Sequence, residues 1–111
     1  MQVYQELAYF LAHVSAGLQS MGLWQTQPPA AEALASTEPF AVDKLSFNQW
    51  LQFIFVPQMQ QIIASQSPLP ESCSIAPMGE EFFSQQQNLH PQKSAAMLEH
   101  LAALDRLITH N

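Results

Sequence analysis

Apolar residues recur at helical spacing over the first twenty residues of the chain. They follow one another at steps of three and four: Val3, Leu7, Phe10, Val14, Leu18 and Met21. This spacing is typical of an amphipathic helix that buries one face, and it predicts a helix over residues 2–22. Gly22 marks its end, because glycine readily adopts the left-handed conformation that closes many helices.

A second long helix is predicted over residues 46–65. Ser46 and Gln49 have the spacing of a capping box. Apolar side chains then cover nearly every side of its first half, as is typical of a central, buried helix. These residues are Phe47, Trp50, Leu51, Phe53, Ile54, Phe55 and Val56, followed by Met59, Ile62 and Ile63. Pro57 removes one backbone hydrogen bond, so we expect a kink there. We expect the kinked helix to pack against the first helix along one half and against the last helix along the other. A strand over residues 53–56 is the alternative, and the spacing on both sides of Pro57 favours the helix.

The C-terminal residues predict a third long helix. Pro91 suits the first helical position, with His90 or Asn88 as the N-cap. Apolar residues repeat at helical spacing from there onward: Met97, Leu98, Leu101, Leu104, Leu107 and Ile108. One or two helical turns are expected over residues 30–34. A short helix is expected over residues 79–87, after an ordered loop over residues 71–78. Ile75 and Met78 of this loop, and Leu69 just before it, are expected to pack inward.

These elements predict a single all-α domain over residues 1–111, a compact bundle of three long helices and one or two short ones. The connectors are rich in proline and long for a simple up-and-down bundle. We expect them to cross the ends of the bundle and to bury Trp24, Phe40 and Ile75.

Charge narrows the range of partners. Nine acidic residues against three basic ones give the 111-residue chain a formal charge of −6. Binding of nucleic acid by this chain alone is not expected, because such affinity comes mostly from Lys and Arg neutralising phosphates. Binding to an anionic membrane surface is not expected either. The sequence predicts no targeting segment or membrane span, and the single cysteine excludes an internal disulfide. The cytoplasm is therefore the expected location.

Candidate catalytic chemistry is sparse. The four histidines have no spacing that names a metal site, and we interpret them as boundary residues: His13, His90, His100 and His110. Cys73 has no neighbouring base to form a thiolate. Asp105 lies on the last helix, where we expect it to pair with a group on another helix. The sequence thus predicts no catalytic residues, no metal site and no cofactor.

An ordered set of short motifs resembles one known family. The motifs are Ser36-Thr37-Glu38-Pro39-Phe40, Asp43, Trp50-Leu51-Gln52, Pro57-x-Met59, Leu69-Pro70, Ile75-Ala76-Pro77 and His90-Pro91. Together they are similar to the YqcC-like family of small proteobacterial proteins. The resemblance implies a short, acidic, helical protein. It also brings the label tRNA pseudouridine synthase C, which the family carries through genomic association with that enzyme.

We interpret the chain as a non-catalytic interaction or accessory protein whose partner is a larger, more basic enzyme, the synthase, or a second copy of itself. Contact with the partner is expected at Phe40, Trp50, Gln52 and Phe53, on the connector and the first half of the second helix. The alternative for these residues is that they only fill the core. The alternative for the function is that this chain is itself part of the tRNA pseudouridine synthase C activity, so enzymatic function stays open.

Overall fold

The computed structural model describes residues 2–37, 44–86 and 90–110. Its described elements are all helical: α1 (Gln2–Ser20), α2 (Ala31–Leu34), α3 (Phe47–Trp50), a π-helical turn η2 (Leu51–Phe55), α4 (Val56–Ser65), α5 (Ala76–Ser84) and α6 (Pro91–Thr109). The expected all-α architecture is confirmed. No helix in these described ranges is both long and apolar enough to cross a membrane.

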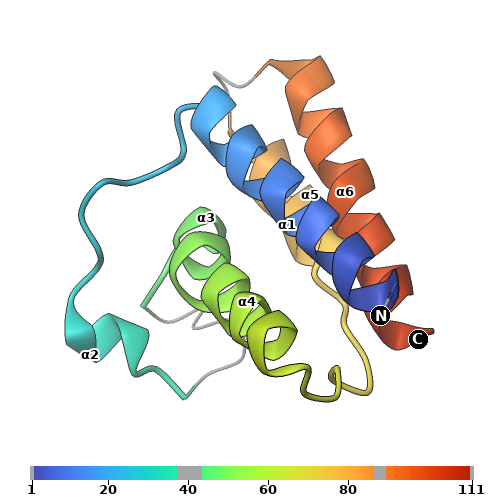
Figure 1. Ribbon diagram of the computed structural model, residues 1–111. Helices are drawn as coiled ribbons and strands as arrows, with labels where there is room; N and C mark the ends of the chain where they lie inside the picture. The colour runs from blue at the N-terminus through green and yellow to red at the C-terminus, as the bar shows by residue number, and fades with distance from the viewer. Residues whose placement is uncertain (1, 38–43, 87–89, 111) are drawn as a thin grey trace.

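Helix α1 lies at the centre of the arrangement. It packs against α6 on one side and against α4 on the other, while α5 packs on α6 (Figure 1). Both α6 and α4 run antiparallel to α1 (Figure 1). The sequence suggested that the second helix would pack on α6 along one half. Instead, its α4 part packs mainly against α1, and its α3 part packs mainly against α5.

One hydrophobic core joins these helices. Buried side chains come from α1 (Leu7, Leu11, Val14 and Leu18), from the second helix (Phe47, Leu51, Phe55, Val56 and Met59), from Ile75 and Phe83, and from α6 (Met97, Leu101, Leu104 and Ile108). The spacing of the α1 and α6 residues is the three-and-four spacing from which both helices were predicted. Burial of these faces is therefore the main source of their stability.

The second helix is continuous through α3, η2 and α4, and a π-helical turn lies directly before Pro57, the residue at which a kink is expected. In this turn the Val56 N–H donates to the Leu51 carbonyl, five residues back. The core residues Phe47, Leu51, Phe55 and Met59 are spaced by four, and in a regular α-helix each such step would drift by about 40° around the axis. The wider turn takes up part of this drift, so that these residues keep facing the core.

Two glycines explain where α1 ends and how closely it packs. Gly22 has a φ of +72°, the left-handed conformation expected of a residue that terminates a helix. At Gly17 a Cβ atom would lie 2.5 Å from Cε of Met97. The absence of a side chain at Gly17 therefore leaves room for the end of the Met97 side chain from α6.

Two expectations about the connectors need correction. Helix α5 begins at Ala76 rather than at Gly79, so that Met78 lies in a helix and not in a loop. Trp24 is not buried: 36% of its surface is exposed. Ile75 is buried as expected. Phe40 and Asp43 lie outside the described residues.

Candidate functional site

The residues expected to contact a partner fall in different environments. Trp50 is partly buried and packs against the core, with its rings 6.1 Å from Phe47 and 5.3 Å from Phe55 between centroids. Gln52 is buried. Phe53 is partly buried, yet it is not among the partly buried apolar residues that pack against the core cluster. Trp50 and Gln52 therefore face inward, whereas Phe53 lies outside the core cluster.

Gln52 binds the chain's own connector. Its Oε1 accepts from the Gln25 N–H at 2.9 Å, and its Nε2 donates to the Gln25 carbonyl at 2.7 Å. One turn earlier, Asn48 donates its amide to the Leu23 carbonyl at 3.0 Å. Asn48 and Gln52 are the buried polar side chains of the described chain, and these bonds satisfy them. Together they attach the connector after α1 to the second helix, so that Gln52 already has a structural role.

Replacing Gln52 with leucine should loosen this connector. The change keeps a side chain of similar length but removes both bonds to Gln25, and we expect a loss of about 1–2 kcal/mol in the free energy of unfolding. Amide hydrogen exchange should rise at Gln25 while α6 stays protected. An unchanged exchange rate at Gln25 would contradict the role given to Gln52. Gln60→Leu, at an exposed position of α4, is the matched control.

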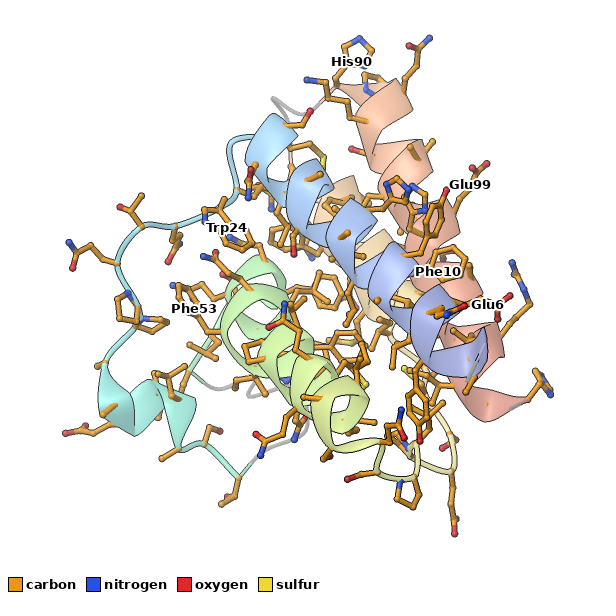
Figure 2. All side chains as sticks on the ribbon, in the orientation of Figure 1. Glu6, Phe10, Trp24, Phe53, His90 and Glu99 are labelled. Carbon is orange, nitrogen blue, oxygen red and sulfur yellow. The ribbon has the colours of Figure 1, made fainter. Side chains whose placement is uncertain are left out.

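An outward apolar strip follows the second helix on the side away from the core. We call it the outer face and define it as Phe53, Ile54 and Pro57, which share one side of the helix at spacings of three and four. Phe53 and Ile54 are partly buried and Pro57 is exposed. Figure 2 shows Phe53 on the side of the helix that faces away from α1. Phe53 and Ile54 therefore lie outside the core cluster of the described residues.

A pocket of about 210 Å³ lies beside Trp50 at the other side of the same helix. It is lined by Trp50, Phe55, Gln58, Met59, Pro70, Ser72, Cys73, Ser74, Ile75 and Ile108. Burial raises the pKa of the Cys73 thiol to about 12, and the hydrogen bond and the negative charge of Asp105 act in the same direction. A thiol with such a pKa is protonated at neutral pH and is a poor nucleophile.

Asp105 holds the start of α5 in place from α6. Its two carboxylate oxygens accept from the backbone N–H of Ile75 at 2.8 Å and of Ala76 at 2.9 Å. The first N–H groups of a helix lack partners within the helix, and a carboxylate there satisfies them. The expected pairing of Asp105 with another helix is thus found, with backbone groups as the partners. This contact also explains why α5 begins earlier than its sequence indicated.

Histidines from two helices meet at the surface. His13 of α1 and His100 of α6 stack, with ring centroids 4.9 Å apart. Sequence spacing could not reveal this pair, because the two residues are 87 positions apart. The described residues hold no group of three or more His, Cys, Asp or Glu side chains that could bind a metal ion.

Comparisons with known proteins agree on one family. The family model DUF446, described as tRNA pseudouridine synthase C, matches residues 6–107. A protein of Haemophilus influenzae named as uncharacterized is 42% identical over 94 residues, which cover 85% of this chain and 84% of that protein. The uncharacterized protein YqcC of Escherichia coli is 32% identical over 84 residues, 76% of this chain and 73% of that protein.

Two further matches give the fold and a longer relative. The solution NMR structure of Escherichia coli YqcC matches with a TM-score of 0.79 at 28% identity, over 98% of this chain and 90% of that one. A protein of Pectobacterium carotovorum named tRNA pseudouridine synthase C is 39% identical over 62 residues, which are 56% of this chain but 16% of that protein. The extent of the family match and the shared fold lead to one conclusion: the chain belongs to the YqcC-like family, DUF446.

Proposed function

We propose that the protein is a non-catalytic helical accessory protein that binds a tRNA pseudouridine synthase. The observation that carries this proposal is the Pectobacterium relative. In that protein, named tRNA pseudouridine synthase C, a segment similar to this chain makes up only 16% of the length. A module that shares one polypeptide with a much larger remainder is held permanently beside it. We infer that the separate chain binds the corresponding enzyme without a covalent link.

Charge supports this choice of partner. An enzyme that binds tRNA needs basic surface to neutralise phosphates. This chain carries a formal charge of −6. Opposite charge on two proteins speeds their association and helps to orient them. Because tRNA modification takes place where tRNA is used, the proposal also places the protein in the cytoplasm.

The contact surface we propose is the outer face, formed by Phe53, Ile54 and Pro57. Phe53 and Ile54 are the large apolar residues of the second helix that are partly exposed and do not belong to the core cluster. Aromatic residues are enriched among the side chains that contribute most to binding between proteins. Gln52 supports this surface from behind by fixing the connector.

A direct catalytic role is the alternative, and it receives less support from the side chains that could carry it. Pseudouridine synthases use an aspartate, and Asp105 in Leu104-Asp105-Arg106 is the candidate on α6. Both of its oxygens accept backbone N–H groups at the start of α5. A carboxylate engaged in this way serves the fold, and the raised pKa of Cys73 leaves that thiol protonated.

The test combines binding with activity. The purified chain, the purified synthase and their mixture are each assayed for pseudouridine in tRNA and for complex formation by light scattering after size exclusion. We expect a complex of the two proteins, with pseudouridine formed only when the synthase is present. Pseudouridine formed by this chain alone would refute the non-catalytic role. If the chain formed a complex with itself and none with the synthase, the choice of partner would be refuted.

Two variants locate the surface. Phe53→Ser should weaken binding to the synthase at least tenfold, because it removes an aromatic contact. Gln60→Ser changes an exposed residue of the same helix that lies beside α1, and it should leave the affinity unchanged. Equal affinities for the two variants would place the contact elsewhere on the molecule.

A further inference from the structure

The contact between His13 and His100 joins the two terminal helices of the chain. The imidazole rings are nearly parallel, at an interplanar angle of 12° and a centroid separation of 4.9 Å. Tyr9 meets the ring of His13 edge-on at 4.2 Å, and Phe10 lies 6.2 Å from His100. Both histidines are partly buried. One aromatic side chain of α1 therefore flanks each histidine on the boundary between α1 and α6, which we call the α1–α6 seam.

The surroundings offer the pair little compensating charge. The side chains whose charge acts on His100 are His13 across the seam and Glu99 on its own helix. Helix α4, which packs on the other side of α1, has no titratable side chain in Val56–Ser65. Helix α5 brings Glu80 and Glu81, and both are exposed. A protonated His100 would thus face a like charge on His13 across the seam, while the negative charge of Glu99 would favour its protonated form.

We propose that His13 and His100 form a proton-sensitive contact in the α1–α6 seam. The rings pack when they are neutral or share one positive charge, and the contact weakens when both are protonated. Two imidazolium rings at this separation repel each other, and each would also lose hydration by remaining against Tyr9 and Phe10. A positive charge on His13 therefore opposes protonation of His100 across the seam.

The electrostatics of His100 agree with this geometry. Partial burial lowers the pKa of His100 below its usual value of 6.5, His13 lowers it further, and Glu99 acts in the opposite direction. A group whose pKa is lower in the folded state binds fewer protons there than in the unfolded state. Its contribution to stability is therefore complete above about pH 6.5 and is lost as the pH falls below that value.

The test follows each histidine by NMR as the pH is varied in the presence of EDTA. In the native chain we expect His100 to titrate below 6.5. In His13→Phe, which keeps an aromatic ring but removes its charge, His100 should titrate at a higher pH. The midpoint of thermal unfolding should fall between pH 7.5 and pH 5.5 in the native chain. It should fall by less in His13→Phe, where burial of His100 remains but the charge of His13 is gone, and by least in His100→Gln, which removes the titrating group.

His110→Gln is the matched control, since it removes an exposed histidine at the end of α6 and leaves the pair intact. It should keep the full dependence of the native chain. Two results would overturn the proposal: a His100 titration that is the same with and without His13, or a loss of stability on acidification that is equal in the pair variants and in the control. The NMR titration of the native chain gives a separate check, because His100 titrating at or above 6.5 would also contradict it.

Discussion

Phe55→Ala should destabilise the protein far more than Phe53→Ala, although the two residues are only two positions apart. Phe55 is 4% exposed and belongs to the core cluster, so truncating it removes a buried ring and leaves a cavity. Such changes cost about 3–5 kcal/mol. Phe53 lies on the outer face, and its truncation should cost only about 1 kcal/mol, because its side chain buries less apolar surface than that of Phe55.

Urea unfolding followed by circular dichroism measures both changes under the same conditions. The midpoint for Phe55→Ala should shift strongly to lower urea, while Phe53→Ala should stay close to the native chain. Similar losses for the two variants would show that Phe53 is a core residue, and the outer face would then not be a free surface. A small loss for Phe53→Ala together with weaker synthase binding would support its place in an interface.

Asp105→Ala should lower the free energy of unfolding by about 2–4 kcal/mol. Hydrogen bonds to a charged group contribute about 1.5–3 kcal/mol each, and this change leaves the N–H groups of Ile75 and Ala76 without their acceptor. The loss should be greatest at the start of α5. Hydrogen exchange at Ala76 and the following residues should therefore rise more than exchange in α1.

Two further variants separate the effect of Asp105 from a general change on α6. Asp105→Asn keeps one acceptor oxygen and should cost less than the alanine variant. It also removes the negative charge next to Cys73, so the pKa of that thiol should fall. Arg106→Ala changes the exposed neighbour and should cost little. If Arg106→Ala were as damaging as Asp105→Ala, the carboxylate would not be the important group.

The three long helices could be predicted because their own residues determine them. In α1 and α6 the buried positions repeat at helical spacing, and Pro91 and His90 mark the start of α6 correctly. The His90 imidazole accepts from the Gln92 N–H at 3.2 Å, as expected of an N-cap. At the second helix, the Gln49 side chain accepts from the Ser46 N–H at 3.0 Å, which is one half of the predicted capping box.

Features that depend on a second segment could not be predicted in this way. Helix α5 starts at Ala76 because Asp105, nearly thirty residues later, accepts its first N–H groups. The π turn keeps Leu51 and Phe55 facing a core that other helices complete. Gln52 looked like a surface residue for a partner, whereas its amide matches the backbone of Gln25. A sequence records these residues but not the segments they meet.

The pairing of the first helix with the last one has a consequence for how the molecule comes apart. The start of α1 and the end of α6 lie at the same end of the bundle (Figure 1). Each of these helices buries its apolar face largely against the other. A fragment that lacks either helix would therefore contain only one side of that interface. Local opening of either end therefore exposes both helices. The protein should unfold as a single cooperative unit, with no smaller part that is stable alone.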